Sequence, residues 1–186
     1  MNKPIFFLLL CLLSFAACKD EGTSIDADLH YDGENESAPF LDAGTWEAAA
    51  RFPMSIMTEF QGRNLEEVEF FILERPDACA IHIYGEGNSD EAGTLLYSED
   101  VSGSVNANSW NRHTLSAPLA INGDDLWISV VVTHNSPIAS VGCDEGPAEL
   151  DGDWTYSHDD GEWRSLNFRS NQQVNINWNI RGYVGE

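Results

Sequence analysis

Residues 174–184, "VNINWNIRGYV", alternate apolar and polar side chains with a period of two. One face carries the apolar residues Val174, Ile176, Trp178 and Ile180. The other face carries Asn175, Asn177, Asn179 and Arg181. Successive side chains of a β-strand point to opposite faces, so strict alternation predicts a strand with one face on a core and one toward solvent. This stretch indicates a β-fold that closes with its last strand.

Similar strand signals recur along the chain between turn-forming residues. "LEEVEFFIL" (65–73) and "CAIHIY" (79–84) alternate, and "LWISVVVT" (126–133) is apolar on both faces, as in a central strand. Short strands are also expected at 46–52, 94–98, 110–115, 153–157 and 162–166, and one or two helical turns at 54–60. "HDDG" (158–161) is a hairpin turn signal between the last two of these strands. About nine short strands predict a sandwich or a barrel.

Composition separates the chain from several functional classes. The 186 residues include six Trp and nine Phe, so a disordered chain is excluded. Nine basic against 31 acidic residues give a formal charge of −22, which repels nucleic acid and anionic membrane surfaces. A need for solubility alone would explain this acidity. The more specific interpretation is calcium binding.

The first residues have the anatomy of an export signal. Lys3 precedes the apolar stretch 5–15, and Ala16 and Ala17 stand directly before Cys18. An apolar run of this length is too short to span a bilayer, so residues 1–17 are expected to be a signal peptide. The alternative left open is an ordinary signal peptide followed by a chance cysteine.

"FAAC" (15–18) resembles the lipobox of bacterial lipoproteins, in which the signal is cut before a cysteine that is then acylated. The following Lys19-Asp20-Glu21 resembles the surface-export signal of lipoproteins in Bacteroidota. The resemblance implies a fatty-acid (palmitate) anchor at Cys18 in the outer membrane, with the protein facing the cell exterior. Residues 18–28 would then be a tether and residues 29–186 the folded domain.

Seven segments in order resemble a β-sandwich module of secreted and surface proteins of Bacteroidota. They are "AARFP" (49–53), "LEEVEFFI" (65–72), "GTLLYSEDV" (93–101), "WNRHTL" (110–115), "LWISVVVTH" (126–134), "GCDEGP" (142–147) and "NWNIRGYV" (177–184). Such modules occur beside fibronectin type III, cleaved-adhesin and peptidase domains, and their general shape is similar to that of carbohydrate-binding modules. The resemblance implies an all-β, antiparallel sandwich of jelly-roll type with at most one short helix.

Cys79 and Cys143 remain in the exported chain once Cys18 is assigned to lipid. Two cysteines in an oxidising compartment predict a disulfide. Two separately buried thiols are the alternative.

The densest acidic segment is "CDEGPAELDGDW", residues 143–154. Calcium takes six to eight oxygen ligands, often from carboxylates on a flexible loop. Asp144, Glu145, Asp151 and Asp153 are therefore candidate calcium ligands, and Asp32, Glu34, Asn35 and Glu36 form a second, weaker cluster. The alternative is an acidic surface loop in which Asp and Gly only make turns.

Aromatic residues flank the predicted hairpin close to this acidic segment. Trp154, Tyr156 and Trp163 are candidates for stacking on a sugar ring, with Asn177, Asn179 and Arg181 as hydrogen-bonding partners for its hydroxyls. The alternative places the tryptophans in the core and the asparagines on a solvated face. The HExxH, GxSxG and CxxC motifs are absent from the sequence, so no enzyme activity is expected. The sequence predicts a non-catalytic, surface-anchored protein that binds glycan or acts as an adhesin; the alternative is an accessory subunit of a surface protein complex.

Overall fold

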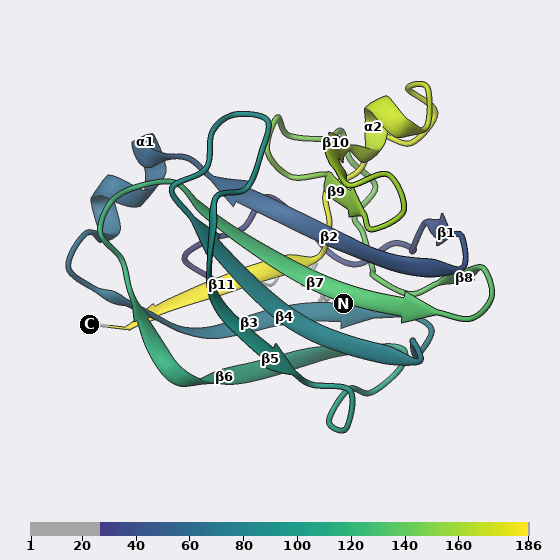
Figure 1. The fold of residues 1–186 in the computed structure, drawn as a ribbon, viewed down its shortest axis with the longest axis horizontal. Coiled ribbons are helices and arrows are strands. Elements are labelled where there is room, and N and C mark those ends of the chain that lie inside the picture. The colour runs from purple at the N-terminus through teal and green to yellow at the C-terminus, as the bar shows by residue number, and fades with distance from the viewer. Residues whose placement is uncertain (1–26, 186) are drawn as a thin grey trace, which may run out of the picture.

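The computed structural model describes residues 27–185 and shows an antiparallel β-sandwich (Figure 1). The strands in this range are β1 (Phe40–Leu41), β2 (Gly44–Phe52), β3 (Asn64–Ile72), β4 (Ala78–Gly85), β5 (Thr94–Asp100), β6 (Ser109–Ala120), β7 (Leu126–His134), β8 (Ile138–Ala139), β9 (Trp154–Ser157), β10 (Glu162–Ser165) and β11 (Ile180–Gly185). Two four-residue helices, α1 (Met54–Met57) and α2 (Leu166–Arg169), and a 3-10 turn (Thr58–Phe60) complete it. The predicted signal peptide and Cys18 lie outside the described residues.

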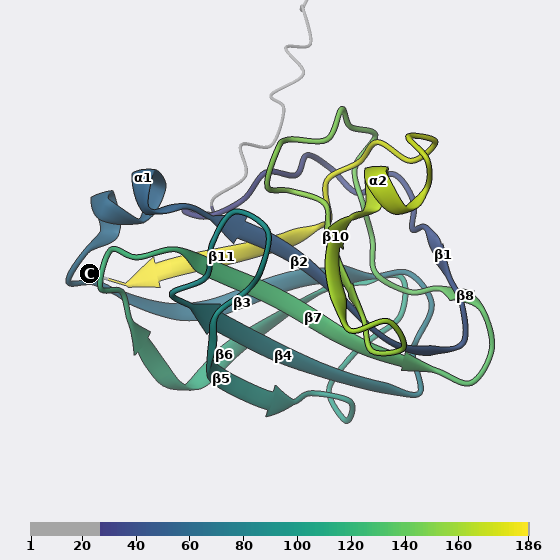
Figure 2. The same cartoon turned by 45° about the horizontal axis from the view of Figure 1, so that its top comes forward.

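The two main sheets have the orders β10-β9-β2-β7-β4-β5 and β11-β3-β6, and β1 and β8 form a separate pair. The chain passes back and forth between the layers, because β2, β4 and β7 lie in one sheet and β3, β6 and β11 in the other (Figures 1 and 2). This confirms the predicted all-β sandwich. The structure adds a second short helix and two strands beyond the expected nine.

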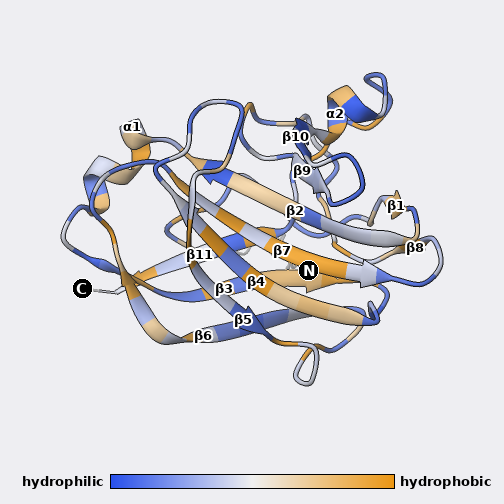
Figure 3. Ribbon diagram, in the orientation of Figure 1, coloured by the Kyte–Doolittle hydropathy of each residue, from blue (hydrophilic) through white to orange (hydrophobic). Residues whose placement is uncertain are grey.

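The core forms where the inward faces of the two sheets meet. In β7, Ile128, Val130 and Val132 point inward and are fully buried. Burial of such a side chain stabilises the fold by about 1.5–3 kcal/mol relative to exposure. Figure 3 shows the same distribution, with apolar colour concentrated on β4 and β7 and hydrophilic colour on the edge strand β5.

The outward face of the six-stranded sheet carries a second apolar cluster. Ala49, Trp127 and Trp154 form its buried part, with Tyr84, Ala92 and Trp163 packed against it. The members that lie in strands project outward because each is one residue out of phase with the inward-pointing residues of its strand, whereas Ala92 reaches the cluster from the β4–β5 loop. β7 is therefore buried on both sides, as its apolar sequence predicts.

The closing stretch 174–184 differs from its prediction in two respects. Only its end is ladder-paired, in β11. Residues 174–178 meet the irregular segment 142–152 instead of a strand, with an isolated bridge between Trp178 and Cys143, and the chain bends at Asn179 before β11 begins. Most of the polar face is not solvated: Asn175 is exposed, but Asn177, Asn179 and Arg181 are 3%, 0% and 7% exposed. Alternation identified the apolar face correctly, but it does not reveal a polar face that loops cover.

The disulfide prediction is wrong, because Cys79 and Cys143 are both free and buried. Cys79 points into the core from β4, while the Sγ atom of Cys143 lies 3.4 Å from the Oγ atom of Ser37. Burial raises the pKa of both thiols, that of Cys79 to about 12 with a further contribution from Asp100. The alternative of two separately buried thiols is the correct one. No helix within residues 27–185 is long and apolar enough to cross a membrane.

Candidate functional site

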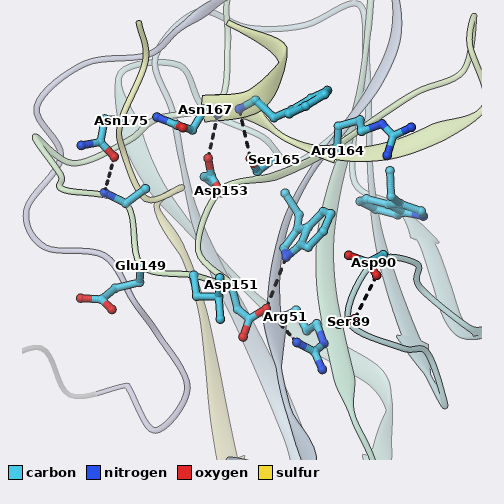
Figure 4. Close-up of a pocket in the computed structure, with 15 residues that line it drawn as sticks. Arg51, Ser89, Asp90, Glu149, Asp151, Asp153, Arg164, Ser165, Asn167 and Asn175 are labelled. Atoms are coloured by element: carbon cyan, nitrogen blue, oxygen red, sulfur yellow. Dashed lines mark hydrogen bonds and ion pairs between the residues drawn. The ribbon is translucent and has the colours of Figure 1, made fainter. Parts of the chain in front are cut away.

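A pocket of about 470 Å³ opens beside the β9–β10 hairpin (Figure 4). One wall is the segment 148–151, and α2 with Asn175 forms a second wall. The tip of the β4–β5 loop, with Ser89 and Asp90, lies on a further side. The pocket is therefore assembled from segments far apart in the sequence.

Two tryptophans give the pocket its apolar surface. Trp154 pairs with Ala49 of β2 and with Ser165 of β10, while Trp163 pairs with Tyr156. This register puts Trp154, Tyr156 and Trp163 on the same outward face of the sheet. Trp154 is 9% exposed and Trp163 is half-buried, and both line the pocket. The structure thus brings together two of the predicted aromatic residues at a pocket, with Tyr156 behind Trp163 at a ring distance of 5.2 Å.

Two exposed apolar side chains stand at the pocket rim. Leu150 is 86% exposed and Phe168 is 68% exposed, and both line the pocket. Neither residue was predicted from the sequence as part of a site, although each is a large apolar residue between two polar neighbours. Exposed side chains of this size at a pocket rim are suited to contact with a ligand.

Charged groups at the pocket floor are already paired with one another. Arg51 donates from Nη1 to Asp151 at 2.9 Å and from Nη2 to Asp125 at 2.7 Å. The indole nitrogen of Trp154 lies 3.5 Å from the same Asp151 carboxylate. The guanidinium of Arg51 therefore holds the Asp151 carboxylate in place, and this carboxylate lies beside the indole N–H of Trp154.

Asp153 links β9 to α2. Its carboxylate accepts a hydrogen bond from the backbone N–H of Asn167 at 2.9 Å, and its carbonyl accepts one from Leu166 at 2.7 Å. Burial raises the pKa of Asp153, against the opposing effect of the Asn167 N–H. Satisfying the first N–H groups of a helix is the ordinary role of such a residue. Asp153 therefore positions α2, and with it Asn167 and Phe168.

Asn177 holds the acidic segment 143–154 in place through three side-chain hydrogen bonds. Its Oδ1 atom accepts a hydrogen bond from the Glu149 N–H at 2.7 Å, and its Nδ2 atom donates to Asp144 at 2.9 Å and to the Pro147 carbonyl at 3.1 Å. A Cβ atom at Gly152 would lie 2.3 Å from Asn177 Oδ1, so only glycine allows this approach. Asn177 builds the pocket wall instead of facing a ligand.

The other two predicted hydrogen-bonding residues lie away from the pocket. Arg181 pairs with the buried Asp32 at 2.8 Å and stacks over the ring of Trp110 at 3.8 Å, while Asn179 donates to Asp32 at 2.8 Å. Burial raises the pKa of Asp32, and the hydrogen bonds from Arg181 and Asn179 oppose that effect. Both residues belong to a buried network that joins the three-stranded sheet to the segment around Asp32.

The four predicted calcium ligands do not converge on one point; three of them accept hydrogen bonds from different parts of the protein. Asp144 accepts four N–H groups, Asp151 pairs with Arg51, Asp153 accepts the Asn167 N–H of α2, and Glu145 is exposed. Within residues 27–185, no three or more His, Cys, Asp or Glu side chains are placed together to hold a metal ion. The buried carboxylates therefore have structural roles in this fold, and calcium binding stays a prediction.

A polar cluster lies beside the aromatic one on the same sheet face. The buried Glu47 accepts hydrogen bonds from Tyr84 and Ser129 at 2.8 Å each, and His158 and His82 lie 3.3 and 3.5 Å from its carboxylate. Burial alone would raise the pKa of Glu47, but hydrogen bonds from His82, Ser129 and Tyr84 outweigh it and lower the pKa. Tyr84 in turn meets Trp163 edge-on at 6.0 Å, so this cluster helps to fix the pocket aromatic.

No family model, curated protein or solved structure matches the chain.

Proposed function

We propose that this chain is a non-catalytic surface lipoprotein that binds glycan in the pocket beside the β9–β10 hairpin. The observation that carries the proposal is the placement of the half-buried Trp163 and the exposed Phe168 and Leu150 around one hollow. Broad apolar faces with a few polar groups among them are typical of sites that hold small polar ligands with apolar faces. A pyranose ring has one such face and a ring of hydroxyls.

The polar groups for those hydroxyls are at the same pocket. The Oδ1 atom of Asn167, the Nδ2 group of Asn175 and the carboxylate of Asp90 can meet those hydroxyls. Other polar atoms of the same side chains serve the fold: Asn167 Nδ2 donates to the Val174 carbonyl at 2.9 Å, Asn175 Oδ1 accepts from the Ala148 N–H at 2.9 Å, and the Ser89 hydroxyl donates to Asp90 at 3.0 Å. These residues take the role that the sequence analysis gave to Asn177, Asn179 and Arg181. Both arginines at the pocket are occupied, because Arg51 pairs with Asp125 and Asp151, and Arg164 with Glu162.

The charge balance favours a neutral glycan. The pocket lining has four carboxylates, Asp90, Glu149, Asp151 and Asp153, against the two arginines, and the whole chain carries −22. Uronic acids and sulfated sugars would meet excess negative charge without a free guanidinium to bind them. Neutral hexose chains meet no such opposition.

The test is affinity electrophoresis and calorimetry of the exported chain with neutral polysaccharides (galactomannan, xyloglucan, mixed-linkage glucan) and with alginate and polygalacturonate. We expect binding to at least one neutral polymer and to neither acidic one. Trp163→Ala should weaken that binding at least tenfold. Trp110→Ala, a partly exposed tryptophan on the three-stranded sheet, is the matched control and should leave it unchanged. Absence of binding to all neutral polymers, or an equal effect of the two variants, would refute the proposal.

The alternative function, an accessory subunit of a surface complex, has one observation in its favour. Leu150 and Phe168 are exposed enough to enter a pocket on another protein, and together they project from the pocket rim. Loss of co-purification with surface proteins in a Leu150→Ser/Phe168→Ser double variant, with glycan binding absent in the parent, would favour this alternative. In both cases the anchor at Cys18 is part of the proposal, and mass spectrometry of the exported chain for acyl adducts tests it.

A further inference from the structure

The indole N–H of Trp127 is buried without a hydrogen-bond partner. Trp127 is 0% exposed, and its Nε1 atom meets no hydrogen-bond acceptor among residues 27–185. In water this N–H would be hydrogen-bonded, so its isolation destabilises the observed conformation. By contrast, the equally buried Trp178 donates from Nε1 to the Trp154 carbonyl at 2.9 Å. An unpaired indole in the middle of a sheet face needs a physical reason.

The cover over this N–H is the β4–β5 loop, residues 86–93. A Cβ atom on Gly87 would lie 3.0 Å from Trp127 Nε1, so the loop backbone passes directly over it. The loop has its own internal hydrogen bonds, from the Asn88 N–H to the Glu91 carbonyl at 2.9 Å and from the Asp90 N–H to Asn88 Oδ1 at 2.8 Å. In the described part of the chain, none of its hydrogen bonds reaches β7, β9 or β10. Ala92 contributes apolar contact with the cluster, and Figures 1 and 2 show the loop as an arch between β4 and β5.

The base of the arch has the backbone of a hinge. Glu86 has φ 56, a left-handed conformation that is unfavourable for a side chain of this kind. Gly93 packs so closely that a Cβ atom would lie 2.2 Å from the Gly85 carbonyl oxygen. The closed arch therefore combines a strained residue at its base with an unpaired indole under it.

The space under the arch continues the pocket. The Trp127 ring lies 5.1 Å from each of the pocket rings Trp154 and Trp163. The arch tip, Ser89 and Asp90, is already a pocket wall (Figure 4). Raising the arch would extend the aromatic surface from Trp163 to Trp127 and expose one indole donor.

We propose that residues 86–93 are a lid and that Trp127 is the inner binding subsite of the pocket, its indole N–H donating to an oxygen of the ligand when the lid is raised. The ligand part of this inference rests on the proposed function, whereas the opening of the lid does not. Ligand binding would provide the acceptor that the closed form lacks, which is the differential interaction needed to shift the population toward the open form.

The lid is tested without ligand by hydrogen exchange of the indole N–H groups in the ¹⁵N-labelled protein. Trp127→Phe identifies the Trp127 resonance by its disappearance. We expect the indole N–H of Trp127 to exchange by local opening, at a rate at least tenfold higher than that of the Trp178 indole N–H and the Val130 amide. This rate should change little when a low concentration of urea is added. Exchange as slow as Trp178, with the urea dependence of global unfolding, would overturn the lid.

The inner subsite is tested by titration with the hexasaccharide of whichever neutral polymer binds. The Trp127 indole resonance should shift together with those of Trp154 and Trp163, and Trp127→Phe should lower the affinity about tenfold. Ala92→Gly removes the apolar contact between the lid and the aromatic cluster but leaves Ser89 and Asp90 in place. It should preserve or raise the affinity, because the opening cost falls. Shifts of Trp154 and Trp163 alone, with unchanged affinity in Trp127→Phe, would refute the inner subsite and leave the pocket function intact. No shift in any indole would refute the proposed function, and the exchange result would still decide the lid.

Discussion

Asp144→Asn should destabilise the protein far more than an isosteric change at a surface loop normally does. Asp144 is 7% exposed and accepts hydrogen bonds on both oxygens. Oδ1 accepts from the N–H groups of Gly146 at 2.9 Å and Asn177 at 2.7 Å. Oδ2 accepts from the Gly33 N–H at 3.1 Å and from Asn177 Nδ2 at 2.9 Å. An asparagine has one acceptor oxygen, so either orientation of its amide places an NH₂ group against two donors.

The magnitude follows from those four contacts. Two hydrogen bonds to a buried charged acceptor are lost, and each contributes about 1.5–3 kcal/mol, so the free energy of unfolding should fall by about 3–6 kcal/mol. This compares with a total of about 5–15 kcal/mol for a typical domain. The pocket wall should also loosen, because Asn177 loses a partner while still holding Glu149 and Pro147.

The assay is urea unfolding followed by tryptophan fluorescence, repeated with calcium and with EDTA. The matched control is Glu145→Gln, which makes the same chemical change at the exposed neighbour and should stay within about 0.5 kcal/mol of the parent. A loss below about 1 kcal/mol for Asp144→Asn would show that the hydrogen-bond argument is wrong. A loss that is present with calcium and vanishes with EDTA would show that Asp144 is a metal ligand, as the acidic sequence suggested.

Three further predictions concern the other buried groups. Glu47→Gln should lower the free energy of unfolding by about 1.5–3 kcal/mol at neutral pH. Because the pKa of Glu47 in the folded protein is lowered below 4.5, the stability difference between the parent and this variant should shrink as the pH falls below that value, as urea titrations would show. The pH dependence at Asp153 should have the opposite sign, because the raised pKa of Asp153 makes its ionisation unfavourable in the folded state. The free energy of unfolding of Asp153→Asn relative to the parent should therefore increase as the pH rises from below 3.8 to 7. A stability difference that does not change with pH would contradict this. Reductant should leave the melting temperature unchanged, and Cys79 and Cys143 should react with a thiol reagent only on unfolding, which mass spectrometry of the labelled chain would check.

The strands were predictable from the sequence because each has a local cause. Alternation or a β-branched run marks β3, β4 and β7, and "HDDG" marks the β9–β10 turn. Trp154 and Trp163 were predictable as a pair because the hairpin register places them on one face. These features depend on neighbours within a few residues.

The functions of the polar residues were not predictable in the same way. Asn177 and Asp144 are 33 positions apart, and Arg181 and Asp32 are 149 apart. A period-two pattern shows that Asn177 and Arg181 share a face, but not that segments 32–33 and 144–152 cover that face. The acidic segment therefore suggested a metal site, whereas most of its buried carboxylates accept N–H groups from distant parts of the chain.

The distribution of positive charge distinguishes the two candidate functions. The seven arginines are the only basic residues of Lys or Arg type in the described range 27–185. Five of them pair with carboxylates, namely Arg51, Arg112, Arg164, Arg169 and Arg181. Arg63 and Arg75 donate to backbone carbonyls. Within residues 27–185 the surface thus carries many more carboxylates than guanidinium groups, and most of those guanidinium groups are already paired with a carboxylate.

A protein partner held by that surface would have to be basic, and its affinity would fall steeply as salt screens the attraction. A neutral glycan stacked on Trp163 and Phe168 would be bound by contact area and neutral hydrogen bonds, so its affinity should change less than twofold between low and high salt. Calorimetry at two ionic strengths measures this directly. A tenfold or larger loss at high salt would argue against the glycan and in favour of a basic partner on the same acidic rim.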